Sequence, residues 1–152
     1  MLQIGYFSTA SGPQDAGIVH RILVASRQAN ARNFITGLLV AGGGRYLQVI
    51  EGPDAAVETL FRNIEEDDRH MAVASFCLRK IHERSFKSWA MAFRRPTLVG
   101  QPNSFLDILE ALTSDIPDTG LKYQINYFVQ ATMMSDAMLG LGLANPSVRL
   151  SA

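Results

Sequence analysis

Apolar residues alternate with polar ones, or form short unbroken runs, in five segments of the first 95 residues. Such patterns predict strands. In the first segment, Ile4, Tyr6 and Ser8 share one face of a short strand. The other four predicted strands are ITGLLVA (35–41), RYLQVIEG (45–52), MAVASFCLRKI (71–81) and WAMAFRR (89–95).

A helix is predicted over residues 15–31, where apolar side chains recur at helical spacing. One of its stripes begins with Val19 and Leu23 but ends with the polar residues Ser26 and Asn30. A helix that only packs on a sheet does not usually finish in this way. We therefore expect the polar end of the stripe to face something other than the core.

A second helix is predicted over GPDAAVETLFRNIEED (52–67), which begins with a proline and an early aspartate, both typical of a helix N-terminus. The predicted order of elements is βαββαββ. This order is typical of an α+β, ferredoxin-like sheet with two helices packed on one face.

The pattern changes after residue 95. Residues 96–102 contain two prolines and predict a linker, so we divide the chain into 1–95 and a C-terminal extension, 96–152. The extension contains two predicted amphipathic helices, one around Phe105 and Leu112 and one over 122–139. They are too small to form a second core, so we expect them to dock on the open face of the sheet or on another subunit.

The composition of the chain argues against several classes of partner and location. The 152 residues contain 14 Lys plus Arg and 14 Asp plus Glu, and this balance argues against a nucleic-acid partner, which needs a basic field. No apolar run approaches the roughly 20 residues of a membrane-spanning helix, and the N-terminus lacks the basic start of a secretory signal. We therefore expect a cytoplasmic protein with no membrane partner.

Several features that could suggest a binding or catalytic site are better explained as structural. Gly42–Gly44 lie between two strands, which favours a hairpin tip over a phosphate-binding loop. Cys77 is the only cysteine, and the three histidines lack the spacing of a metal site, so we expect no metal. The acidic run 65–68 is interpreted as a solvated helix end.

Polar residues in apolar surroundings are the stronger signal. Gln48 lies in the middle of an apolar strand, and Tyr6 lies in another. Each of them, like Ser26 and Asn30, could simply have a structural hydrogen-bond partner, because buried polar groups usually do. Together they suggest a polar ligand held between the helices and the sheet.

Five segments at matching spacing make the chain resemble the BLUF family, blue-light sensors that use FAD. They are GYFS (5–8), SRQAN (26–30) followed by ITGLL (35–39), LQVIEG (47–52), DDRH (67–70) and FKSWAM (86–91). The resemblance covers about residues 1–95. It implies a ferredoxin-like sheet with flavin inserted between two helices.

The resemblance also implies roles for individual residues. Tyr6 would donate an electron and a proton to the excited flavin, and Gln48 would rearrange its hydrogen bonds between Tyr6 and the flavin. The other implied positions are flavin contacts or their hydrogen-bond partners at Ser8, Ser26, Asn30, Arg69 and His70, a cation for the FAD phosphates at Arg27, and signal relay at Trp89 and Met91. From the stripes, we expect the flavin faces to contact Val19, Leu23, Val57 and Ile64 or their neighbours.

We therefore expect a photoreceptor that is not an enzyme and that signals through a downstream protein or its own oligomer. Two alternatives stay open: a small flavin oxidoreductase, and an interaction module that keeps the fold but does not respond to light. The predicted C-terminal helices have apolar faces to which no packing partner is assigned, and such faces favour a homo-oligomer.

Overall fold

The computed structural model describes residues 1–13, 16–87, 91–94, 110, 113–114 and 116–140. The elements are β1 (Leu2–Ala10), α1 (Ala16–Arg32), β2 (Thr36–Gly42), β3 (Arg45–Gly52), α2 (Asp54–Glu65), β4 (His70–Lys80), β5 (Ala92–Arg94) and α4 (Thr119–Gly140). The predicted linker, 96–102, lies outside the described residues, and so does nearly all of the predicted helix around Phe105.

The strands form one sheet in the order β4-β1-β3-β2-β5. β1 pairs antiparallel with both β3 and β4, β2 pairs antiparallel with β3, and β5 pairs parallel to β2. The predicted ferredoxin-like α+β fold is confirmed. Of the predicted fifth strand, residues 92–94 pair with β2, and residues 89, 90 and 95 lie outside the described residues.

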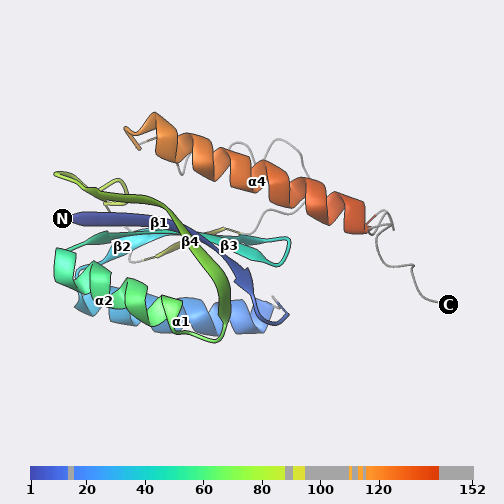
Figure 1. Cartoon of the computed structure of the whole chain (residues 1–152), viewed down its shortest axis with the longest axis horizontal. Coiled ribbons are helices and arrows are strands. Elements are labelled where there is room, and N and C mark those ends of the chain that lie inside the picture. Colours follow the sequence, from blue (N-terminus) through green and yellow to red (C-terminus); the bar gives the residue numbers. More distant parts are fainter. Residues whose placement is uncertain (14–15, 88–90, 95–109, 111–112, 115, 141–152) are drawn as a thin grey trace.

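The sheet is covered on both faces (Figure 1). Because side chains alternate along a strand, each strand feeds two separate clusters. On one face, Ile4, Leu39 and Ile50 pack with α1 and α2. On the other face, Leu38, Val40, Leu47 and Val49 pack with α4 through Leu121, Ile125, Phe128 and Val129. The predicted docking of a C-terminal helix on the open face of the sheet is therefore correct for α4.

The β2–β3 hairpin turns at Gly43 and Gly44, whose φ angles are 56° and 72°. Two consecutive residues in the left-handed region are what a tight hairpin turn requires, and glycine adopts that region without strain. The prediction of a hairpin tip, and not a phosphate loop, is confirmed. This turn fixes the register that brings Gln48 of β3 next to Leu39 of β2.

Truncation of a side chain between α4 and the sheet tests this packing. Ile125 is fully buried, so we expect Ile125→Ala to lower the free energy of unfolding by about 2–5 kcal/mol, measured by urea denaturation. Gln130→Ala, at an exposed position of the same helix, is the control and should change it by less than about 0.5 kcal/mol. Equal effects of the two substitutions would contradict the docking of α4.

Candidate functional site

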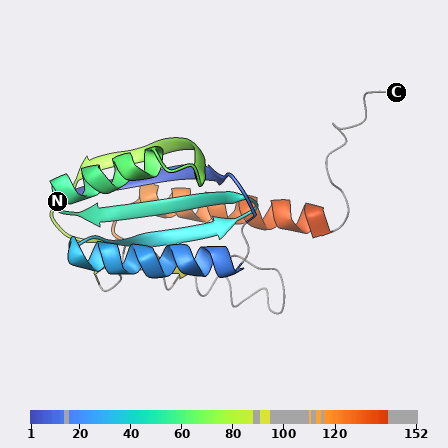
Figure 2. The same ribbon diagram turned by 90° about the horizontal axis from the view of Figure 1, so that it is seen from below.

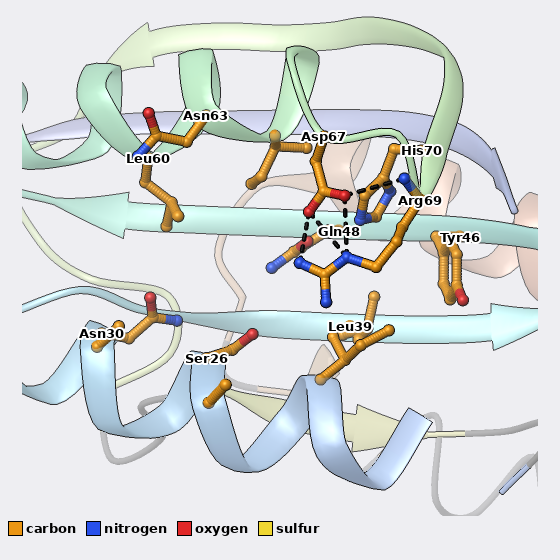
Figure 3. Close-up of a pocket in the computed structure, with 14 residues that line it drawn as sticks. Ser26, Asn30, Leu39, Tyr46, Gln48, Leu60, Asn63, Asp67, Arg69 and His70 are labelled. Atoms are coloured by element: carbon orange, nitrogen blue, oxygen red, sulfur yellow. Dashed lines mark hydrogen bonds and ion pairs between the residues drawn. The ribbon is translucent and has the colours of Figure 1, made fainter. Parts of the chain in front are cut away.

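Helices α1 and α2 lie over the same face of the sheet (Figure 2). A cavity of about 250 Å³ lies between them, above the central strands (Figure 3). That volume is many times the roughly 10–15 Å³ that one water needs. Its apolar wall is formed by Ile22, Ala25, Ala29, Leu39, Leu60 and Ile64. Its polar lining is formed by Ser26, Asn30, Tyr46, Gln48, Asn63, Asp67, Arg69 and His70.

Helix α1 lines the cavity with small and polar residues. Ala25, Ser26 and Ala29 have short side chains, which leave room between the helix and the sheet. Val19 and Leu23 are instead buried in the core cluster beneath the helices. The stripe of α1 thus divides along its length: its first two turns pack on the sheet, and its last two border the cavity.

Of the four residues predicted by name for the flavin faces, three do not line the cavity, whereas the neighbouring residues Ile22 and Leu60 do. Val57 joins Val19 and Leu23 in the core cluster, and of the four only Ile64 lines the cavity. Helical periodicity identifies which residues share a face. It does not tell where along that face a helix leaves the sheet.

Tyr6 and Gln48 are directly paired across β1 and β3. Tyr6 is fully buried, packs against the ring of Phe61, and donates a hydrogen bond from its hydroxyl to Gln48 Oε1. Burial raises the pKa of Tyr6 well above its ordinary value, so the phenol stays protonated and remains a donor. Gln48 lines the cavity and Tyr6 lies behind it. The amide therefore connects the phenol to whatever occupies the cavity.

The other end of the Gln48 amide meets Met91. Gln48 Nε2 lies 3.5 Å from Met91 Sδ, and the Met91 sulfur is a weak acceptor. Met91 is buried, and its main-chain oxygen accepts a 3.0 Å hydrogen bond from Arg27 Nε. Arg27 is exposed and does not line the cavity. Within the described part of the chain, Arg27 therefore contacts the main chain of Met91 and not the cavity.

Asp67 holds the guanidinium of Arg69 at the edge of the cavity (Figure 3). Arg69 Nε donates to both carboxylate oxygens, at 2.9 and 3.0 Å, and Nη2 lies 2.5 Å from Oδ2. The hydrogen bonds from Arg69 lower the pKa of Asp67 to about 2, and Asp67 in turn raises the pKa of Arg69. The pair is therefore ionised over all ordinary conditions.

Asp67 and Asn63 line the cavity but were not predicted as site residues. The interpretation of the acidic run as a solvated helix end is wrong for Asp67. A signal was present in the sequence, since Leu60, Asn63, Ile64 and Asp67 recur at helical spacing. The polar members of that stripe resemble the polar end of the stripe in α1.

His70 lies at the start of β4 and borders the cavity. Its Nδ1 lies 2.8 Å from Ser8 Oγ, and its ring is 5.2 Å from that of Tyr46. Burial lowers the pKa of His70, which favours the neutral imidazole. Ser8 is buried and does not line the cavity, so its contact with a ligand would be indirect, through His70.

The structure thus brings most of the predicted site residues together. Ser26, Asn30, Gln48, Arg69 and His70 line one cavity. A second group stands behind the lining or beside it, namely Tyr6, Ser8, Arg27 and Met91. Trp89, predicted for signal relay, lies outside the described residues.

The lining fits a flat ring system with a polar edge. The apolar side chains of Ile22, Leu39, Leu60 and Ile64 come from both helices and the sheet, as ring faces require. The buried amides of Asn30 and Gln48 offer donors and acceptors, and Arg69 offers donors only. An isoalloxazine ring has this combination of apolar faces and a hydrogen-bonding edge.

The described residues contain no helix long and apolar enough to cross a membrane. They also contain no group of three or more His, Cys, Asp or Glu side chains that could hold a metal ion.

Known proteins share both the sequence pattern and the fold. Photoactivated adenylate cyclase subunit beta of Euglena gracilis is 27% identical over 126 residues, which cover 78% of this chain and 15% of the relative. The dark-state structure of BlrB, a BLUF protein, has a TM-score of 0.65 and 28% identity, and the match covers 86% of this chain and 96% of that one. A bacterial light-regulated adenylyl cyclase matches with a TM-score of 0.65 and 25% identity, over 88% of this chain and 40% of that one.

The cyclase comparisons concern only a part of each relative, because this chain spans about 15% of the length of the curated proteins first matched. The family model described as sensors of blue-light using FAD, or BLUF, covers residues 1–92. These residues hold the whole described cavity lining together with Tyr6 and Met91. The chain therefore belongs to the BLUF family of flavin-binding blue-light sensors.

Proposed function

We propose that this chain senses blue light with non-covalently bound FAD, and that Tyr6 and Gln48 convert absorption into a reversible change of hydrogen bonding. The observation that supports this proposal is the buried series Tyr6–Gln48–Met91 at the wall of the cavity. The chain acts as a sensor and not as an enzyme, and its signal goes to a partner protein or to a second copy of itself.

Asn30, Gln48 and Arg69 are the residues that would hold the polar edge of the flavin. A bound flavin supplies absorption of blue light and a ring that accepts an electron. Arg27 remains a proposed cation for the FAD phosphates, and its bond to the Met91 carbonyl gives it a second role in holding Met91. Ser26 and His70 add polar contacts from opposite sides of the cavity.

Tyr6 and Gln48 form a switch because a carboxamide has an acceptor at one end and donors at the other. In the arrangement described here, Gln48 Oε1 accepts from the Tyr6 hydroxyl and Nε2 faces Met91. When light draws an electron and the phenolic proton from Tyr6, the amide can rotate or change tautomer. Its donors and acceptor are then exchanged between Tyr6 and the cavity. The chain returns to its starting state without net chemistry.

Asp67 holds the Arg69 side chain in one rotamer, so the position of its N–H donors is fixed before a ligand binds. Such preorganisation reduces the entropy that binding must overcome. The same ion pair makes one part of the site sensitive to acid.

The direct test is the visible absorption spectrum of the purified full chain in darkness and after blue light. We expect a flavin spectrum that shifts slightly to the red and recovers in darkness, with chromatography of the released chromophore identifying FAD and not FMN. Flavin that bleaches with NADPH would indicate an oxidoreductase. A chain that binds no flavin after reconstitution would contradict the proposal.

Removal of one hydroxyl tests the role of Tyr6. Tyr6→Phe keeps the ring that packs against Phe61 and removes the donor to Gln48, so we expect flavin to bind and the reversible red shift to be lost. Tyr46→Phe is a matched control, since Tyr46 is also buried and lines the cavity, and it should keep the shift. A normal photocycle in Tyr6→Phe would refute the assignment of Tyr6 as donor.

Acid should weaken the hold of Asp67 on Arg69. The folded pKa of Asp67 is lowered from 3.8 to about 2, so its contribution to stability is present above the ordinary value and is lost as pH falls through this window. At pH 6 we expect Asp67→Asn to lower the free energy of unfolding by up to about 1 kcal/mol. The difference from wild type should shrink towards pH 2.

Urea denaturation between pH 2 and 6 measures this effect. Asp68→Asn is the control, because Asp68 is the exposed neighbour of Asp67 and should show no such convergence. A difference between Asp67→Asn and wild type that is the same at every pH would show that the ion pair does not stabilise the fold.

A further inference from the structure

Glu51 is a fully buried acidic residue on the face of the sheet opposite the cavity. Its Oε1 accepts hydrogen bonds from Thr36 Oγ1 at 3.2 Å and from the main-chain N–H of Phe86 at 2.7 Å. Its Oε2 accepts from Gln3 Nε2 at 2.9 Å and from the main-chain N–H of Ser85 at 3.1 Å. A carboxylate away from water is tolerated only when it is fully hydrogen bonded, and here each oxygen has two donors.

The segment held by Glu51 leads along the chain to Met91. Phe86 is buried in the cluster beneath α4, whereas Met91 is buried in the cluster beneath α1 and α2. These two residues, five positions apart in the chain, are therefore buried on opposite faces of the sheet. Glu51 accepts a hydrogen bond from the main chain at Phe86, and the Met91 sulfur contacts the Gln48 amide.

A second set of contacts runs from Glu51 to α4. Gln3 bonds to Glu51 through Nε2, and its Oε1 accepts from Arg79 Nε at 2.9 Å. Arg79 Nη1 forms an ion pair with Asp118. Asp118 Oδ1 in turn accepts from the main-chain N–H of Leu121 at 2.5 Å, which makes Asp118 the N-cap of α4. The network ends at the first turn of the helix that covers the far face of the sheet.

We propose that Glu51 is a positioning residue that couples the Gln48 switch to α4. It holds the segment that carries Met91 through two main-chain hydrogen bonds, and it connects that segment to Asp118 through Gln3 and Arg79. This inference rests on the proposed function of Gln48.

The chemistry of Met91 gives the coupling a direction. A thioether accepts a hydrogen bond but donates none, so a fixed Met91 sulfur favours the orientation in which Gln48 Nε2 faces it. When light exchanges the ends of the amide, Met91 loses its side-chain contact with Gln48 and keeps the main-chain bond from Arg27. The change reaches the Ser85 and Phe86 N–H groups, and through Glu51 it reaches the cap of α4.

Glu51→Gln tests the first half of the proposal. Each carboxylate oxygen holds one main-chain N–H, so a glutamine in either orientation turns its NH2 group towards one of them and leaves that N–H without its acceptor. Loosening Met91 weakens its preference for the dark orientation of Gln48. We therefore expect a photocycle with dark recovery about tenfold slower, which corresponds to about 1.4 kcal/mol on the barrier. Glu58→Gln, at an exposed position of α2, should recover as wild type does.

Arg79→Gln tests the second half, because it removes the ion pair with Asp118 and leaves the bonds of Glu51 to Ser85 and Phe86 intact. The measurement is amide hydrogen exchange in the first turns of α4, in darkness and in light, on the flavin-loaded full chain. We expect light to change exchange there in wild type. In Arg79→Gln, the dark recovery should be unchanged and the light-dependent difference in α4 should be lost. Arg79→Lys, which keeps the charge, should keep part of that difference.

The outcomes separate this inference from the proposed function. Absence of a reversible red shift in wild type contradicts the proposed function and the inference with it. If wild type has a normal red shift, then Glu51→Gln recovering at the wild-type rate, or Arg79→Gln keeping the full light response of α4, overturns the inference alone. Should Glu51→Gln not fold, Gln3→Met removes the connection to Arg79 while both main-chain bonds remain. It is expected to behave as Arg79→Gln does, and a full α4 response in it would equally overturn the coupling.

Discussion

The buried amide of Gln48, in the middle of an otherwise apolar sheet, is the constraint on which the arrangement of the site depends. An unsatisfied amide in such a place costs about 1–3 kcal/mol, so its neighbours must supply partners. Pairing of β1 with β3 brings in the Tyr6 hydroxyl, and the residue before β5 brings in the sulfur of Met91. The Tyr6 hydroxyl is a strong hydrogen-bond partner of the amide, and the Met91 sulfur is a weak one. The amide is therefore held well enough to be ordered, but not so well that its orientation is fixed when Tyr6 changes.

Three residues after Gln48, β3 carries a second buried polar side chain, Glu51, and this one is held by strong hydrogen bonds only. Glu51 points to the other face, and all four of its hydrogen bonds come from well-placed donors, two of them main-chain N–H groups. A fully satisfied buried network of this kind is rigid. β3 thus carries a side chain suited to switching on the cavity face and a side chain suited to anchoring on the α4 face. The alternation of side chains along a strand makes this division possible.

The sequence was informative where local pattern decides structure. The hairpin at Gly43–Gly44, the two helices before residue 67 and the ferredoxin-like order follow from periodicity and turn chemistry, and the placement of Tyr6, Asn30 and Gln48 was implied by the family resemblance. Features that depend on which side chains meet were not predictable in this way. Asp67 looks like part of an acidic helix end until Arg69 is seen against it. Glu51 looks like the polar end of a strand, because its main-chain donors lie more than thirty residues away at Ser85 and Phe86.

A signal that begins in the cavity and ends at α4 has to pass the sheet, since α1 and α2, which border the cavity, lie on the face opposite α4 (Figure 1). The strand ladder itself is a poor route, because β1, β3 and β2 are paired along nearly their whole length and can shift only by breaking several hydrogen bonds together. The segment between Phe86 and Met91 is different. Phe86 and Met91 belong to the two different apolar clusters, and they contact Glu51 and Gln48 respectively. A change worth a single hydrogen bond can bias two packings of such a segment, whereas it could not rebuild the sheet. Phe86 and Met91 thus connect the two faces of the sheet through contacts with Glu51 on one face and Gln48 on the other.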